Sequence, residues 1–123
     1  MEGTVLIVDD SPTVVKFVTY SLKSSGLKVV TASDGMDAIE KISSLGSPID
    51  LIITDLNMPN MDGYELIVTL RENEEYSDTP IIILSSEEED ADKALGSEVG
   101  ANSYLTKPFK SSLLLSEVKK FLG

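Results

Sequence analysis

The feature that most constrains the fold is a regular alternation between short β-branched runs and longer amphipathic segments. Three runs predict buried strands because every position in them is apolar: 5–8, 51–53 and 81–84. Two weaker strand candidates, 28–31 and 103–106, mix polar and apolar residues. A segment of helical length follows each run. Such alternation predicts a parallel sheet with helices on both faces, because right-handed crossovers place the helices there.

The segments between the runs carry helix start and stop signals. Ser11 followed by Pro12 is typical of an N-cap and a first helical residue, and Gly26 is typical of a helix end. Gly96 makes the fourth helix the weakest, since glycine inside a helix costs about 1 kcal/mol relative to alanine. The expected helices are one between Pro12 and Gly26, one over 33–44, one capped by Asp62, one over about 90–99 and one over 111–122.

Five strand–helix units without a long linker or repeat predict a single α/β domain over residues 1–123. With five units, the expected strand order is 2-1-3-4-5, the flavodoxin-like arrangement. Ligands of such sheets bind beyond the carboxyl ends of the strands, where the strand order reverses. The residues that follow the predicted strands are therefore the candidates for chemistry.

Composition excludes several classes of function. The net charge of −11 argues against a nucleic-acid partner, because phosphate contacts require clustered Lys and Arg, and favours cations or a protein with a basic face. The chain has no Cys and no His, which excludes disulfides, thiolate catalysis and imidazole chemistry of its own. No apolar run approaches the ~20 residues of a membrane span, and no signal-peptide pattern opens the chain, so a cytoplasmic location is expected.

Charged and hydroxyl side chains follow four of the predicted strands. Asp9 and Asp10 end the first strand, Asp55 the third, Ser85 the fourth and Lys107 the fifth. Strands 1 and 3 are neighbours in the predicted order, so three carboxylates converge. At ~5 Å and an effective dielectric near 20, each pair repels by roughly 3 kcal/mol. A divalent cation offsets this repulsion, and all-oxygen ligands indicate Mg²⁺ or a similar hard ion.

The same residue types are suited to binding a phosphoryl group. An incompletely ligated Mg²⁺, the Lys107 ammonium and the Ser85 hydroxyl would surround it, and Asp55 is a candidate nucleophile because carboxylates form acyl phosphates. Each residue also has a plainer interpretation. Asp9 and Asp10 are ordinary acids for a helix start, and Lys107 alone would be a solvated surface lysine. Convergence of the four strand ends favours the phosphoryl site.

Four segments of the sequence resemble bacterial response-regulator receiver domains over essentially the whole chain. They are VLIVDDS at 5–11, DLIITDLNMPNMDG at 50–63, PIIILSS at 80–86 and GANSYLTKPF at 100–109. Within that family, DDSPT and LNMPNMDG are most similar to the stand-alone chemotaxis (CheY-like) members. The resemblance explains the missing histidine, because a receiver supplies only the acceptor half of a phosphoryl relay.

The resemblance implies a role for each residue of the site. Asp55 would accept the phosphoryl group from a histidine kinase. Asp9 and Asp10 would hold Mg²⁺, with Asp10, Asp55 and the backbone carbonyl of Asn57 as direct ligands. Lys107 would pair with the phosphoryl oxygens.

Further roles follow from the same resemblance. Ser85 would be the switch hydroxyl and Tyr104 the aromatic switch residue, and the peptide bond before Pro108 would be cis. Glu87, together with Asn57, would flank the acyl phosphate and position hydrolytic water, which implies signal lifetimes of seconds to minutes. The output partner would bind the face formed by 90–99, 103–106 and 111–122, and a flagellar-motor target is suggested by the resemblance alone. The chain would be a monomer or a phosphorylation-dependent dimer.

Three other functions remain open at this point. The chain could be a receiver cut from a longer transcription regulator. A Mg²⁺-dependent phosphatase with an aspartyl-phosphate intermediate would use similar residues, but such enzymes place the nucleophilic acid after the first strand and add a cap domain. An FMN-binding electron carrier shares the architecture, but needs a Ser/Thr/Gly-rich loop where Asp9 and Asp10 stand.

Overall fold

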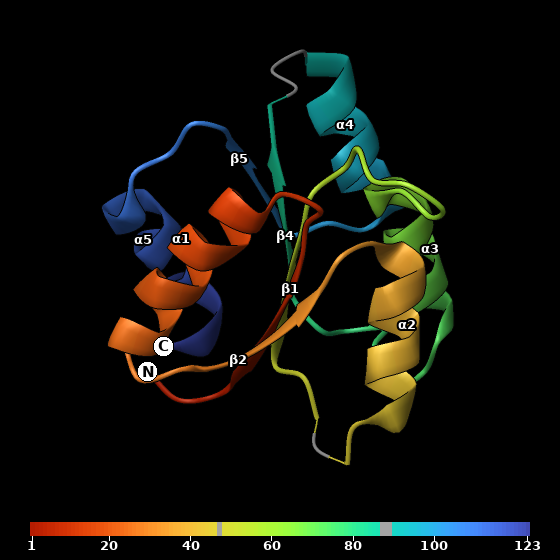
Figure 1. Ribbon diagram of the computed structural model, residues 1–123. Coiled ribbons are helices and arrows are strands. Elements are labelled where there is room, and N and C mark those ends of the chain that lie inside the picture. The colour runs from red at the N-terminus through yellow and green to blue at the C-terminus, as the bar shows by residue number, and fades with distance from the viewer. Residues whose placement is uncertain (47, 87–89) are drawn as a thin grey trace.

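Five parallel strands form one sheet in the order β2-β1-β3-β4-β5, which confirms the predicted flavodoxin-like arrangement. The computed structural model describes residues 1–46, 48–86 and 90–123, without the side chains of 90–92. Helices α1 and α5 cover one face of the sheet, and α2, α3 and α4 cover the other (Figure 1). The strands are β1 (Thr4–Val8), β2 (Lys28–Ala32), β3 (Leu51–Thr54), β4 (Ile81–Ser85) and β5 (Ser103–Thr106).

The apolar runs form the centre of the sheet because they are covered on both faces. Every residue of β3 and β4 is buried, as is all of β1 after Thr4. Successive side chains of β1 point to opposite faces: Leu6 packs in the cluster with α2 and α3, whereas Val5 and Ile7 pack in the cluster with α1 and α5. The mixed strands β2 and β5 are the edges of the sheet.

Four of the five helices begin near their predicted starts, and the other begins later. Ser11 Oγ accepts a hydrogen bond from Val14 N (3.4 Å), and Asp62 Oδ1 accepts one from Glu65 N (2.9 Å). The helix predicted from residue 33 starts at residue 35, because the carboxylate of Asp34 is the N-cap. The helices are α1 (Pro12–Ser24), α2 (Gly35–Ser44), α3 (Gly63–Glu72), α4 (Asp90–Val99) and α5 (Ser111–Leu122). Within the described ranges, none of them is both long and apolar enough to cross a membrane.

Gly96 lies where α4 contacts the sheet. A Cβ at this position would be 2.8 Å from Ile83 Cδ1 and 3.6 Å from the ring of Tyr104. The glycine that weakens the helix in isolation therefore allows α4 to pack closely on β4 and β5.

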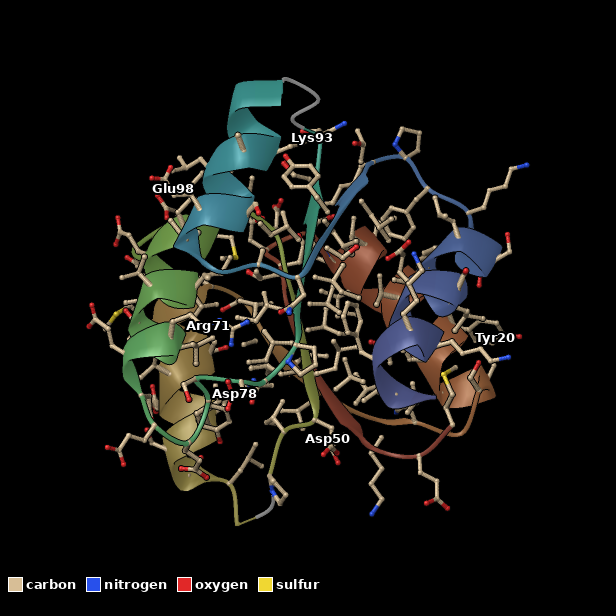
Figure 2. All side chains as sticks on the ribbon, turned by 180° about the vertical axis from the view of Figure 1, so that it is seen from behind. Tyr20, Asp50, Arg71, Asp78, Lys93 and Glu98 are labelled. Atoms are coloured by element: carbon tan, nitrogen blue, oxygen red, sulfur yellow. The ribbon has the colours of Figure 1, made fainter. Side chains whose placement is uncertain are left out.

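Arg71, near the end of α3, joins three segments that are distant in sequence. Its Nε and one Nη donate to the Gly100 carbonyl (3.1 and 2.8 Å), and its other Nη donates to the carbonyls of Tyr76 (2.9 Å) and Thr79 (2.7 Å). A further hydrogen bond reaches Asn102 Oδ1 at 2.9 Å. All five N–H donors of the guanidinium are thus used. In Figure 2, Arg71 extends from α3 toward the interior of the molecule.

Charge is divided between the two sides of the sheet. The residues of α1 and α5 include four lysines and a single acid, Glu117, which accepts hydrogen bonds from Lys120 and Ser103. Residues 34–44 and 62–78, which contain α2 and α3, hold nine acids against Lys41 and Arg71. A chain with a net charge of −11 therefore has one basic helical face.

Candidate functional site

Backbone hydrogen bonds continue past the ends of the strands and fix the residues that follow them. Asp9 N donates to Ala32 O at 3.1 Å, and Asp55 N donates to Val8 O at 2.8 Å. Because β1 and β3 are hydrogen-bonded neighbours, these contacts place Asp9 and Asp55 side by side at the carboxyl edge. Lys107 is fixed in the same way, since its N–H donates to Ser85 O at 2.7 Å.

Three carboxylates meet at this edge. One oxygen from each of Asp9, Asp10 and Asp55 lies within 4.8 Å of the other two. Asp9 and Asp55 are buried, with 3% and 9% of their surface exposed, and Asp10 is open to solvent. The cluster therefore has two walls of low solvation and one accessible side.

The Lys107 ammonium enters the cluster from β5. Its Nζ lies 2.9 Å from Asp9 Oδ2 and 3.5 Å from Asp55 Oδ1. Within the part of the chain that the structure describes, it is the one cation paired with the three carboxylates. One positive charge against three negative charges leaves a net charge of −2 at the site.

Burial raises the pKa of the Asp55 carboxyl above its usual value. The Lys107 ammonium opposes this shift, the negative charge of Asp9 reinforces it, and the Leu56 N–H, which donates to Asp55 Oδ1 at 2.8 Å, opposes it again. The ionised form of Asp55 is thus incompletely compensated by the protein itself. A net charge of −2 and an all-oxygen donor set fit a hard divalent cation such as Mg²⁺.

The loop after β3 packs tightly on Asp55. Gly63 N donates to Leu56 O at 2.9 Å, and a Cβ at Gly63 would collide with the Asp55 carbonyl and lie 2.9 Å from Leu56 Cα. The buried hydroxyl of Thr54 donates to that same carbonyl at 2.8 Å. Sequence reasoning missed Thr54, because a threonine in a strand carries no signal of such a role.

The other predicted residues take these positions. Ser85 is fully buried at the end of β4 and lies in register with Thr106 of β5. Asn57 is exposed in the loop after β3, and Tyr104 is half-buried on β5. The peptide bond before Pro108 is cis, as expected. Glu87 lies outside the described residues.

A family model described as "Response regulator receiver domain" matches residues 5–119. The chain belongs to this family. Receivers of two-component response regulators bind Mg²⁺ at an acidic aspartate cluster such as that of Asp9, Asp10 and Asp55. They also interact with histidine kinases and downstream targets.

Individual receivers are similar over almost the whole chain. Protein PilG of Pseudomonas aeruginosa is 40% identical over 115 residues, which cover 94% of this chain and 84% of PilG. The alkaline phosphatase synthesis transcriptional regulatory protein PhoP of Bacillus subtilis is 38% identical, and the match covers 99% of this chain but 49% of PhoP. The structure of the chemotaxis response regulator CheY4 of Vibrio cholerae matches with a TM-score of 0.91 and 36% identity, over 98% of this receiver and 99% of CheY4.

Magnesium is expected to raise the melting temperature of this receiver, because a ligand that binds only the folded state stabilises it, by ~2.7 kcal/mol at 100 times the dissociation constant. The substitution Asp10→Asn should raise the melting temperature in EDTA by relieving charge repulsion, and should remove the response to Mg²⁺. Thermal unfolding with saturating Mg²⁺ and with EDTA measures both effects. Glu40→Gln, an exposed acid on α2, is the control. Equal melting temperatures with and without Mg²⁺ in the wild type would contradict the metal site.

Proposed function

We propose that this receiver is a phosphorylation-dependent switch that accepts a phosphoryl group on Asp55 from the phosphohistidine of a histidine kinase. The observation that carries the proposal is the placement of the Asp55 carboxylate, 3.5 Å from the Lys107 ammonium and beside two further carboxylates. Asp9, Asp10, Asp55 and the Asn57 carbonyl would hold Mg²⁺. When bound, the ion would neutralise negative charge on the phosphoryl oxygens.

The chemical step is a single displacement at phosphorus. A carboxylate oxygen of Asp55 attacks the phosphorus atom, the P–N bond to the donor imidazole breaks, and the imidazole leaves with the electron pair and takes up a proton. Asp55 Oδ1 is already bound by the Leu56 N–H, which orients the carboxylate. The Lys107 ammonium lies close enough to turn from Asp9 toward a phosphoryl oxygen, which would stabilise the product.

Phosphorylation would act on Ser85 and Tyr104 through charge. The phosphoryl group adds between one and two negative charges, and a hydrogen bond from the Ser85 hydroxyl to it is worth roughly 1.5–3 kcal/mol. Moving a two-state equilibrium from 1:99 to 99:1 requires about 5.5 kcal/mol. Lys107 must therefore also contribute, by exchanging its Asp9 contact for the phosphoryl group. Tyr104, packed beside Gly96 of α4, would follow the displacement of Ser85.

The active conformation is expected to be partly populated before phosphorylation, because the energies available are small. NMR relaxation dispersion on the unphosphorylated protein should detect exchange at Ser85, Tyr104 and the residues of α4. Relaxation that shows a single state at these residues would contradict the proposed switch.

Asn57 and Glu87 would set the lifetime of the acyl phosphate by positioning hydrolytic water. The exposed position of Asn57 in the loop after β3 supports this role. We expect Asn57→Ala and Glu87→Ala to change the dephosphorylation rate severalfold, measured as loss of label after removal of the kinase. Unchanged rates in both variants would exclude this role.

The output partner would bind the face of α4, β5 and α5. Similarity to PilG and to the chemotaxis regulator CheY4 supports a role in motility or chemotaxis, including a flagellar-motor target. Similarity to half of PhoP supports the alternative that the receiver controls transcription as part of a longer protein. Domain 1–123 would act as one switch unit in either case, in the cytoplasm where kinases present phosphohistidine.

Phosphotransfer tests the proposed function directly. Autophosphorylated histidine kinases carrying ³²P are mixed with the purified chain in Mg²⁺ or in EDTA, and the modified peptide is identified by mass spectrometry. Transfer that requires Mg²⁺ and modifies Asp55 is the expected result. Label on another residue would overturn the proposal, and turnover of a generic phosphomonoester would favour the phosphatase instead.

A further inference from the structure

The turn between β2 and α2 lies outside the carboxylate cluster, yet it contacts the chain on both sides of it. On the β1 side, the carbonyl of Ala32 accepts the hydrogen bond from Asp9 N at 3.1 Å. On the β3 side, Asp34 Oδ2 accepts a hydrogen bond from Asn60 Nδ2 at 2.8 Å, although the two residues are 26 positions apart. The turn thus connects the two loops that carry the acids.

A second contact reinforces the first. Gly35 N donates to the carbonyl of Met61 at 3.2 Å, next to the contact between Asp34 and Asn60. A Cβ at Gly35 would lie 2.6 Å from Met61 Cγ and 2.8 Å from the Met61 carbonyl oxygen. Only glycine permits this approach, so the turn and the loop after β3 are packed against each other as well as hydrogen-bonded.

These contacts hold the far end of the segment that carries Asn57. At the near end, Gly63 N is bound to the Leu56 carbonyl at 2.9 Å. At the far end, Asn60 adopts a left-handed backbone conformation with φ of 66°, and its side chain is bound by Asp34. Residues 57–59 lie between these two fixed points. The direction of the Asn57 carbonyl therefore depends on where Asn60 is held.

We infer that Asp34 is a positioning residue for the phosphoryl-acceptor site, because its carboxylate holds Asn60 and thereby orients the Asn57 carbonyl toward the cluster. The inference rests on the proposed function for the role of that carbonyl. Both oxygens of the Asp34 side chain are used, since Oδ1 accepts from Asp37 N at 2.8 Å as the cap of α2. Hydrogen bonds from the Asp37 N–H and from Asn60 lower the pKa of Asp34, which keeps the carboxylate ionised.

Helix capping alone would also explain an aspartate at this position, and Asp34→Asn separates the two roles. The amide oxygen of the variant can still cap α2, but its NH₂ group cannot accept the hydrogen bond from Asn60. Asn60→Asp removes the same bond from the other side by placing two carboxylates in contact. The double variant Asp34→Asn/Asn60→Asp restores a bond, because the new amide can donate to the new carboxylate and the pair keeps its single negative charge.

Two measurements report on positioning rather than on folding alone: amide hydrogen exchange of residues 57–61 in EDTA, and the dissociation constant for Mg²⁺ measured by calorimetry. We expect each single variant to speed exchange in this loop and to weaken Mg²⁺ binding about tenfold, as is typical of residues that support metal ligands. The double variant should return to within about twofold of the wild type. Asp62→Asn is the control, because it removes one charge from the same loop and keeps an oxygen to cap α3.

The outcomes separate this inference from the proposed function. If Asp34→Asn weakens Mg²⁺ binding no more than Asp62→Asn does, or if the double variant fails to recover, Asp34 is a helix cap and the inference is wrong. If the loop and the Mg²⁺ affinity respond as expected but the wild type takes no phosphoryl group on Asp55, the positioning of the metal site stands and the proposed function fails.

Discussion

Asp55→Asn is expected to abolish phosphoryl acceptance and, in EDTA at neutral pH, to make the protein more stable. An amide is not a nucleophile toward phosphorus under these conditions, so incorporation of ³²P from the kinase should fall to background. The gain in stability has a separate cause. Burial and the neighbouring charge of Asp9 disfavour the ionised Asp55 carboxylate, and an amide of the same size removes that cost.

The pH dependence of this gain follows from the raised pKa of Asp55. A carboxyl whose pKa is higher in the folded state than in the unfolded chain contributes stability that is fully present below the unfolded value, 3.8, and is lost as the pH rises through the folded value. The stability difference between Asp55→Asn and the wild type should therefore be small in acid, grow toward neutral pH and shrink again with Mg²⁺. Urea unfolding across this pH range measures it.

Asp50→Asn is the matched control for this experiment. Asp50 precedes β3 at the opposite edge of the sheet, where its Oδ2 accepts a hydrogen bond from Thr4 N at 2.8 Å. Its substitution should leave phosphoryl transfer intact and should not reproduce the pH profile. Retention of ³²P by Asp55→Asn would show that another residue accepts the group.

Arg71→Ala is expected to destabilise the protein by about 3 kcal/mol. Five charge-assisted hydrogen bonds would be lost, and the carbonyls of Tyr76, Thr79 and Gly100 would depend on water for replacement partners. Partial exposure of Arg71 reduces the cost below that of a fully buried group. At roughly 4 °C per kcal/mol, the melting temperature should fall by about 12 °C.

Two further variants distinguish the guanidinium network from charge alone. Arg71→Lys keeps the charge but replaces the planar fork with a single ammonium, so it should recover less than half of the lost stability. Glu72→Ala, at the neighbouring exposed position, should change stability by no more than ~0.5 kcal/mol. Hydrogen exchange should also quicken at Gly100 and Asn102 in Arg71→Ala. A loss under 1 kcal/mol would mean that these segments hold together without Arg71.

Much of the fold could be predicted because its signals are local. The apolar runs of β1, β3 and β4 indicated strands buried on both faces, and Ser11 and Asp62 marked helix starts that the structure confirms. The rule that ligands meet the carboxyl ends of parallel strands identified the edge where Asp9, Asp10 and Asp55 lie together.

The contacts that join distant segments could not be predicted in this way. Lys107 was expected to face the phosphoryl group, but its shorter contact is with Asp9, 98 residues away in sequence. Gly96 was interpreted as a weak point of its helix, whereas its importance depends on the close approach of α4 to Ile83. Such roles arise from packing between elements, and residue type and spacing along the chain do not encode them.

The lysines of α1 and α5 and the acids around α2 and α3 give the molecule an electric dipole directed across its sheet. A charged surface exerts a torque on such a dipole over about one Debye length, ~8 Å at physiological ionic strength, before any atoms touch. Partners of opposite sign are thus turned toward opposite sides of the protein during the encounter. Added salt should slow both associations while leaving the contacts of the final complexes unchanged.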